Sequence, residues 1–274
     1  MLSTMCTEKC SQLTRRAALF GAAAVATTAV LDTPASAAPE RTSALRGGRL
    51  TDLTHPFTTS FPAFVPEEAP TRRTYVTIED DGYYMQEWRI IEHTGTHVDA
   101  PGHFTPGGRL STDLRLSELI TPAVVVDIKA RAARDPDTTV TVDDIRGYER
   151  RHGRIPAGAA VLMNSGWAAK AGDPAAYRGA DADGVLHFPG FHPETTEWLL
   201  RRRKIRSLGV DTLSIDPGVS ETFETHLILT GADRYGLENL AHLDRLPPRG
   251  ATVVVGLIPY EQGSGGQARI FAVS

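Results

Sequence analysis

Residues 93 to 103 read His93-Thr94-Gly95-Thr96-His97-Val98-Asp99-Ala100-Pro101-Gly102-His103, which brings three histidines and one aspartate together in a short stretch. A helix would turn Asp99 about 240° away from His93 and off any shared face. In an extended chain, side chains alternate with a period of two, so these four residues would point to one side. The stretch is therefore predicted to be extended and to gather imidazole and carboxylate groups.

The same stretch must also bend. An unbroken strand would hold the Cα atoms of His93 and His97 about 13 Å apart, too far for both side chains to share one ion. Gly95 lies between them and can adopt backbone angles closed to other residues. Two neutral imidazoles and a carboxylate are a usual ligand set for Zn²⁺ and also suit Mn²⁺ or Fe²⁺, with positions left for water and substrate. The spacing predicts a divalent-metal site.

Strands and helices are predicted on both sides of this stretch. Residues 54–73 contain four prolines and several aromatic residues, which predicts a long ordered loop that could line a pocket. Strands outnumber helices and alternate with them in the second half, which favours a mixed sheet with helices outside. The expected strands are 75–78, 85–92, 123–128, 159–163, 207–210, 252–258 and 268–273, and the expected helices are 142–151, 193–203 and 224–230.

Composition indicates an ordinary globular protein. The chain has 274 residues, of which 41% are hydrophobic and 23% charged, which favours a single domain with a large core. The net charge of −4 argues against nucleic acid as a partner. A small molecule is the expected binding partner.

The first 37 residues are predicted to be a cleaved export signal of the twin-arginine type. Arg15 and Arg16 precede an uncharged run that ends near Ala37. The run is shorter than the ~20 residues of a spanning helix, so we expect no permanent membrane anchor and a secreted or periplasmic location. An ordinary Sec signal is the alternative. Cleavage would remove Cys6 and Cys10 and with them any disulfide or thiolate site.

The stretch from His93 to Phe104 resembles the motif of the cyclase family of metal-dependent hydrolases, which includes bacterial kynurenine formamidases and isatin hydrolases. The resemblance extends from about residue 49 to the end of the chain, through 52–56, 164–167, 188–191 and 209–216. Residues 38–48 are rich in alanine, proline, arginine and glycine without an apolar period, which predicts a flexible lead. The resemblance implies a single compact α/β domain over 49–274, with a central mixed, barrel-like β-sheet and outer helices. It also implies a homo-oligomer, either a dimer or a tetramer.

The resemblance implies roles for individual residues. His93, His97 and Asp99 would be ligands of a first metal ion, and His103 would move protons at the reacting centre. Zinc or manganese is expected, with one or two ions per chain.

The resemblance also implies a second metal ion, bound by Asp99, which both ions would share, and by two residues distant in the sequence. In this sequence the matching positions are His226 and Glu238. Taken alone, His226 is a single histidine in the first turn of a short helix and Glu238 a single acid on a short strand, which are ordinary positions for these residue types.

The expected reaction is hydrolysis of a small cyclic or aryl amide. A metal-bound hydroxide would attack the carbonyl group, with His103 as general acid and base. No Gly-x-Ser-x-Gly motif supports a serine nucleophile. The alternatives are a metal-dependent cyclase or lactonase and a non-catalytic metal-dependent binding protein.

Aromatic residues are expected to form the wall of the substrate site. A flat ring, as in an aryl formamide or isatin, would stack on such a wall, although aromatic residues more often belong to the core. The sequence does not separate kynurenine-type from isatin-type substrates. The expected wall residues are Trp167, Phe188, Phe191, Phe61 and Phe64.

Overall fold

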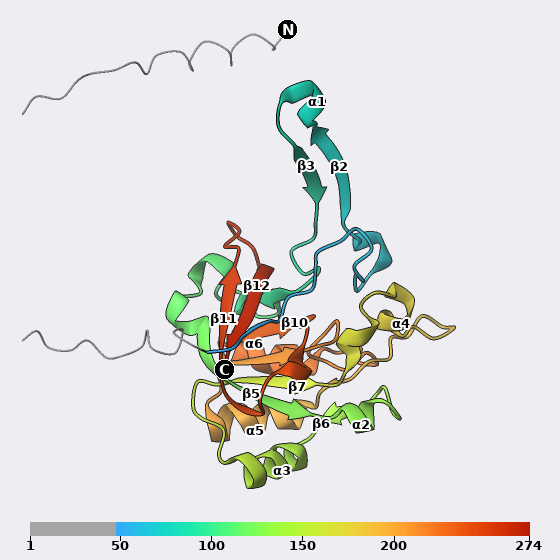
Figure 1. Cartoon of the computed structure of the whole chain (residues 1–274). Helices are drawn as coiled ribbons and strands as arrows, with labels where there is room; N and C mark the ends of the chain where they lie inside the picture. Colours follow the sequence, from blue (N-terminus) through green and yellow to red (C-terminus); the bar gives the residue numbers. More distant parts are fainter. Residues whose placement is uncertain (1–47) are drawn as a thin grey trace, which may run out of the picture. The chain divides into compact units, whose positions relative to one another are not determined.

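The computed structural model describes residues 48–274 (Figure 1). The predicted export signal and all but the last residue of the predicted lead lie outside the described residues. The strands are β1 (Leu50–Asp52), β2 (Thr71–Val76), β3 (Met85–Arg89), β4 (His97–Asp99), β5 (Ile120–Asp127), β6 (Thr139–Val140), β7 (Ala160–Asn164), β8 (Gly190–Phe191), β9 (Ser207–Val210), β10 (Tyr235–Glu238), β11 (Arg249–Leu257) and β12 (Gly265–Val273). The α-helices are α1 (Ile78–Asp81), α2 (Lys129–Ala132), α3 (Val142–His152), α4 (Pro174–Arg178), α5 (Pro193–Arg203) and α6 (Glu224–Gly231).

Seven strands form a closed barrel in the order β12-β11-β5-β7-β9-β10-β4. Pairing of β4 with β12 closes the ring, and β1 pairs with the far end of β12. Strands β5, β7, β9 and β10 run parallel to one another, whereas β4, β11 and β12 join in antiparallel pairings. The prediction of one α/β domain with a mixed, barrel-like sheet is confirmed.

The parallel strands are buried on both faces, which explains their continuous apolar sequence. On β7, Leu162 packs in the cluster inside the barrel. Its neighbours Val161 and Met163 pack in a second cluster, which also holds Ile145 of α3 and Leu199 of α5. Helices α3 and α5 therefore cover the outside of the parallel strands, as predicted (Figure 1). Each such side chain stabilises the fold by roughly 1.5–3 kcal/mol.

Helix ends follow the local sequence closely. Thr141 begins α3, because its side chain accepts the backbone N–H of Asp144. Pro193 occupies the first turn of α5, where its missing N–H costs nothing, and the helix ends at Lys204 in the left-handed conformation. The predictions for 193–203 and for the strand 207–210 match the structure in full.

The predicted strand at 75–78 was wrong in its position. Strand β2 spans Thr71–Val76, so it begins within the predicted loop and overlaps the predicted strand only at residues 75 and 76, and it pairs with β3. Thr77 then ends the strand by accepting the backbone N–H of Asp80, which begins α1. The error has a physical reason: no residue of β2 is buried, so its sequence carries no apolar alternation.

Helices in the described region are all short or amphipathic. None of those between residues 48 and 274 is both long and apolar enough to cross a membrane.

Candidate metal site

The candidate site lies on the outer face of β4 and β10. Val98 and Leu237 point into the barrel core, so their alternate neighbours His97, Asp99 and Glu238 share the opposite face. The antiparallel register sets Glu238 directly across from His97. All three polar side chains are at least 95% buried, with exposures of 1%, 1% and 5%. Pairing of two short strands thus joins residues that are far apart in the sequence.

Two glycines make room for these side chains. Gly236 of β10 and Gly265 of β12 both lie across from Asp99, one on each side. A Cβ atom at Gly236 would lie 2.7 Å from Asp99 Oδ2, and one at Gly265 would lie 2.5 Å from His93 Cε1. Any larger residue at either position would displace a candidate ligand.

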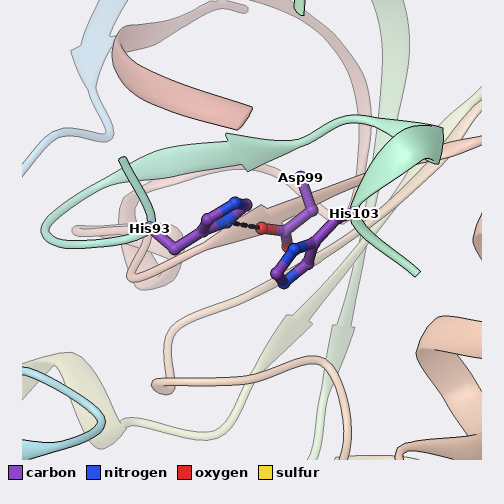
Figure 2. A group of neighbouring side chains, drawn as sticks. All are labelled: His93, Asp99 and His103. Carbon is purple, nitrogen blue, oxygen red and sulfur yellow. Dashed lines mark hydrogen bonds and ion pairs between the residues drawn. The ribbon is translucent and has the colours of Figure 1, made fainter. Parts of the chain in front are cut away.

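His93 and His103 reach the site from either side of β4. The prediction of an extended chain over 93–103 was wrong at both ends: only His97–Asp99 is a strand, His93 lies in a turn, and His103 ends a 3-10 helix at Pro101–His103, where proline favours the first helical turn. Gly95, where the sequence predicts a bend, has φ of 77° and lets His93 return towards Asp99. His93 Nδ1 lies 2.7 Å from Asp99 Oδ1 (Figure 2). The ring of His103 stacks on that of His93 with the centroids 3.8 Å apart. Burial lowers the pKa of His103 to about 4 despite the opposing charge of Asp99, so this imidazole is neutral at pH 7.

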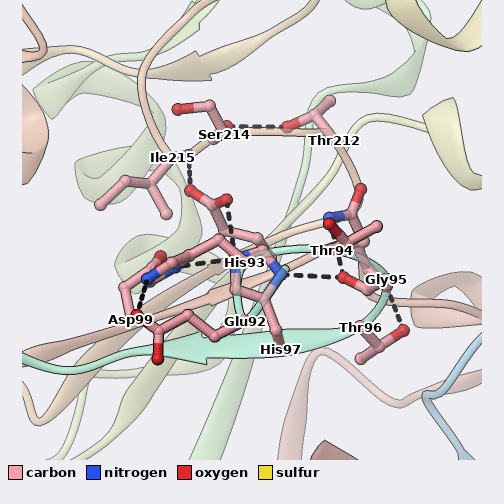
Figure 3. Close-up of polar contacts among 12 residues, drawn as sticks. Glu92, His93, Thr94, Gly95, Thr96, His97, Asp99, Thr212, Ser214 and Ile215 are labelled. Carbon is pink, nitrogen blue, oxygen red and sulfur yellow. Dashed lines mark hydrogen bonds and ion pairs between the residues drawn. The ribbon is translucent and has the colours of Figure 1, made fainter. Parts of the chain in front are cut away.

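His226 enters from the first turn of α6. Its Nε2 atom lies 3.2 Å from Glu238 Oε1 and 3.6 Å from Asp99 Oδ2. Its Nδ1 atom lies 2.6 Å from Asp216 Oδ2. The backbone N–H of Ile215 donates to Glu238 Oε1 at 2.8 Å, so Glu238 is also fixed from outside the site (Figure 3).

His97 shows most directly that the site fits a metal ion. Its Nδ1 donates to the carbonyl oxygen of Gly95 at 2.8 Å (Figure 3), so Nε2 is the ring nitrogen that faces inwards. That Nε2 and Asp99 Oδ2 are buried and make no hydrogen bond of good geometry among the described residues, although Nε2 lies 3.1 Å from Asp99 Oδ1 and 3.4 Å from Glu238 Oε2. Five other buried side-chain atoms between residues 48 and 274 also lack a partner, but none of them belongs to this cluster of imidazoles and carboxylates. Histidine nitrogens beside carboxylate oxygens are suitable donors for zinc or manganese.

Electrostatics lead to the same conclusion. Burial raises the pKa of Glu238, and the neighbouring Asp99 charge raises it further. Burial also opposes ionisation of Asp99, but the surrounding imidazoles, with His97 first, hold its pKa well below the ordinary range. Burial lowers the pKa of His97, yet the two carboxylates outweigh it and raise that pKa to about 9. The two carboxylates thus favour a positive charge between them, and a divalent cation would displace the proton from His97 Nε2 and satisfy both carboxylates at once.

Further polar residues form hydrogen bonds that hold the candidate ligands in place. Ser264 Oγ lies 2.9 Å from His93 Nε2 and donates to Glu92 Oε1 at 2.7 Å. Ser264, Glu92 and Asp216 were not predicted to be site residues. Glu92 directly precedes the stretch 93–103, and Asp216 is the last residue of 209–216, which also resembles the cyclase family. Both residues therefore lie at the edge of a recognisable sequence motif.

A cavity of about 270 Å³ opens onto the site. It is small for a ligand pocket, and its apolar lining includes Phe64, Phe104, Phe223, Ile91 and Leu213. Phe64 lies in the loop before β2, which was predicted to line a pocket. Phe104 and Phe223 were not expected there, although Phe104 directly follows the motif.

The other four predicted wall residues are not among those that line this cavity. Trp167 and Phe188 pack together in a small apolar cluster. Phe191 is fully buried in the core outside the barrel, and Phe61 packs edge-on against Tyr177. Burial of the large apolar area of an aromatic side chain stabilises the fold in the core as well as in a pocket wall. Residue type alone therefore did not distinguish core residues from pocket residues.

Comparison with known proteins agrees with the fold and the motif. The family model described as putative cyclase matches residues 51–217. The isatin hydrolase of Roseibium aggregatum is 37% identical over 203 residues, which cover 71% of this chain and 76% of that protein. The kynurenine formamidase of Bordetella avium is 28% identical over 202 residues, covering 73% of this chain and 86% of that protein.

Solved structures show the same architecture. Isatin hydrolase A from Ralstonia solanacearum aligns with a TM-score of 0.80 and 35% identity, over 87% of this chain and 98% of that one. An isatin hydrolase bound to the product analogue thioisatinate aligns with a TM-score of 0.79 and 30% identity, over 86% of this chain and 99% of that one. The similar proteins include hydrolases. Because the family model matches more than half of the sequence and the barrel is shared, this chain belongs to the cyclase family.

Proposed function

We propose that this chain is a metal-dependent hydrolase of a small cyclic amide of the isatin type. The observation that carries the proposal is that the buried atoms His97 Nε2 and Asp99 Oδ2 make no hydrogen bond, although Nε2 lies only 3.1 Å from the other oxygen of Asp99. Leaving such atoms without a partner costs free energy, and an ion between the ligand residues would remove that cost. The identity to an isatin hydrolase, higher than that to a kynurenine formamidase, favours a cyclic substrate.

Asp99 would be the central ligand. Its Oδ1 faces His93 and His97, at 2.7 and 3.1 Å, whereas its Oδ2 faces His226 at 3.6 Å. One carboxylate can therefore serve a first ion with His93 and His97 and a second with His226 and Glu238. Bound zinc or manganese would supply Lewis-acid polarisation of a carbonyl group and activation of water.

His103 would move the proton. Its neutral imidazole faces the cavity beside His93. It can accept a proton from the attacking water and pass it to the amide nitrogen as the C–N bond breaks. Phe64, Phe104 and Phe223 would contact the faces of a flat ring and exclude water around it.

The ligand set can be tested by elemental analysis of purified wild type, His97→Ala and Glu238→Ala. We expect zinc or manganese in the wild type, lost largely in His97→Ala. With two ions, Glu238→Ala would retain about half. A wild type that binds neither metal after reconstitution would refute the proposal.

The catalytic role can be tested with His103→Ala, using ring opening of isatin followed by absorbance. Loss of a proton carrier should lower kcat by roughly 10²–10⁴-fold while the metal content is kept. His152→Ala, on α3 and outside the cavity, is the matched control. Turnover of N-formylkynurenine without turnover of isatin would contradict the substrate class. Metal binding without turnover of amides or lactones would favour a binding protein.

A further inference from the structure

Basic residues gather where helices α3 and α5 end. Segments 146–154 and 201–204 contain eight of the 29 arginine and lysine residues and only one acidic residue, Glu149. The rest of the chain, with 21 basic and 32 acidic residues, is acidic. This protein therefore has a basic surface of its own within an acidic chain. We call these eight residues the basic face: Arg146, Arg150, Arg151, Arg154, Arg201, Arg202, Arg203 and Lys204.

The two segments meet on the outside of the parallel strands, where α3 and α5 lie side by side (Figure 1). Arg203 of α5 pairs with Glu149 of α3 through two contacts of 2.5 and 2.6 Å. The guanidinium group of Arg154 donates to the carbonyl oxygen of Arg202 at 3.1 Å. The two segments thus form one surface. A groove of about 390 Å³ in this surface is lined by Arg146, Glu149, Arg150, Arg154 and Arg203.

Helix ends alone do not account for so much positive charge. Cations in the last turn of a helix offset the partial negative charge of its C-terminus, which is about half an elementary charge per helix. Besides Glu149, only Asp143 and Glu197 pair with the basic face among residues 48–274, at 3.1 Å from Arg146 and 3.4 Å from Arg201. Three carboxylates and two helix ends leave about four of the eight positive charges without compensation.

The cations that make no ion pair within the described chain are open to solvent. Arg150, Arg151, Arg154, Arg202 and Lys204 are all exposed. Like charges held together at a surface repel one another and attract an anionic partner. Arginine can donate to two oxygens of one phosphate group at once. The chemistry of the basic face therefore suits a surface that presents several phosphate groups.

Two features favour a lipid surface over a nucleic acid. None of the five residues that line the groove is aromatic, so the groove offers no ring on which a base could stack. Trp198 lies beside the groove, half-buried, with the guanidinium carbon of Arg203 4.3 Å from the centre of its ring. Tryptophan is enriched at the boundary between a membrane and water. An indole next to exposed arginines matches the chemistry of a membrane surface.

We propose that the basic face binds the surface of an anionic phospholipid bilayer and makes this chain a peripheral membrane protein. The lipid phosphates accept hydrogen bonds from the exposed arginines, and Trp198 contacts the headgroup region. An anionic surface repels the acidic remainder of the chain, so this face alone turns towards the bilayer. The basic face shares no residue with the lining of the cavity over the metal ligands, so lipid binding is independent of the proposed hydrolase site.

Co-sedimentation of the purified full-length chain with vesicles tests the proposal. The vesicles consist of phosphatidylcholine with about one-third phosphatidylglycerol, at an ionic strength of about 0.1 M. We expect the wild type to bind them. A glutamine variant that lacks four exposed charges should bind at least about 100-fold more weakly, because each cation near an anionic surface adds to the affinity. Its substitutions are Arg150→Gln, Arg151→Gln, Arg201→Gln and Arg202→Gln.

Two control variants separate charge from structure. A lysine variant with the same four arginines changed to lysine keeps the charge and should bind within about threefold of the wild type. A distant variant loses the same number of charges at exposed positions on other elements and should also bind like the wild type. Its substitutions are Arg49→Gln, Arg89→Gln, Arg134→Gln and Arg245→Gln.

The uncharged run 17–31 is the same in all variants, and vesicles of phosphatidylcholine alone measure its contribution. Loss of binding in the glutamine variant only, with release of the wild type at about 0.5 M NaCl, would support the proposal.

Four results would overturn the proposal. The first is wild-type binding to anionic vesicles that is no tighter than to neutral ones. The second is a glutamine variant that binds like the wild type with circular dichroism unchanged. The third is loss of binding in the lysine variant, because charge would then not be the cause. The fourth is tighter binding to a DNA duplex than to the vesicles at the same ionic strength, which would identify nucleic acid as the partner. None of these measurements involves metal or turnover.

Discussion

The imidazole of His226 and the carboxylate of Asp216 form a buried hydrogen bond of 2.6 Å behind the candidate metal site. The same carboxylate oxygen accepts the backbone N–H of His226 at 3.1 Å. An ionised carboxylate only accepts, so Nδ1 of His226 carries the hydrogen and Nε2 is free to face Asp99 and Glu238. Asp216 thereby sets both the orientation and the tautomer of a candidate ligand.

Replacing Asp216 with asparagine should weaken metal binding. The amide keeps the shape of the side chain but removes the charge that fixes the tautomer, and we expect the Kd of the weaker-bound ion to rise about 10–100-fold. Competition with a chromophoric chelator measures this change. Asp183→Asn, on an exposed loop, should leave the Kd unchanged. Equal affinities in Asp216→Asn and wild type would contradict the role given to Asp216.

Gly236→Ala should reduce metal content without unfolding the protein. The new methyl group would lie 2.7 Å from Asp99 Oδ2 and would push that carboxylate out of place. Gly231→Ala is the matched control, because a Cβ atom there meets no atom within 4 Å. Elemental analysis and circular dichroism of both variants would check the prediction. Full metal content in Gly236→Ala would show that the site tolerates the shift.

Gly95→Ala and Gly82→Ala form a pair that separates backbone strain from steric clash. Both glycines have φ of 77°, where any L-residue is strained by roughly 1–2 kcal/mol. A Cβ atom at Gly82 meets open space, whereas one at Gly95 would lie 2.5 Å from the Phe57 ring. Chemical unfolding of the metal-free proteins should show Gly95→Ala to be the less stable by about 1 kcal/mol or more. Equal losses of stability would mean that Phe57 moves aside freely.

Glu118 should make the protein sensitive to acid. Its carboxylate is only 4% exposed and pairs with Arg109, Arg206 and Arg115 at 2.8, 2.8 and 3.2 Å. Burial alone would raise its pKa, but the arginines outweigh burial and lower it to about 2. Because the folded pKa lies below the ordinary value of 4.5, this stabilisation is complete above pH 4.5 and is lost as the pH falls towards 2.

Glu118→Gln should therefore cost about 3 kcal/mol of unfolding free energy at pH 7 and less at pH 3. Urea unfolding at both values measures the difference. Glu221→Gln, at an exposed position, serves as the control. A cost that is the same at both pH values would contradict the assignment of the pKa shift to the arginine pairs.

The sequence determined those features that depend on neighbouring residues. The extended chain around His97, the bend at Gly95 and the bounds of α5 and β9 follow from alternation, glycine freedom and capping, which act over a few residues. The ligand residue types within 93–103 were visible for the same reason. Strand β2 was misplaced because a strand without a buried face leaves no apolar pattern.

Only the tertiary structure decided which distant residues complete the site. The β4–β10 register brings Glu238 opposite His97, and the β4–β12 register brings Gly265 opposite Asp99. Ser264 reaches His93 across 171 positions of sequence. A single serine, glycine or aspartate has no local pattern that indicates its partner, since such contacts arise from strand pairing and barrel closure. The chemistry of the candidate ligands was therefore readable in the sequence, whereas the groups that hold them in place were determined by the fold.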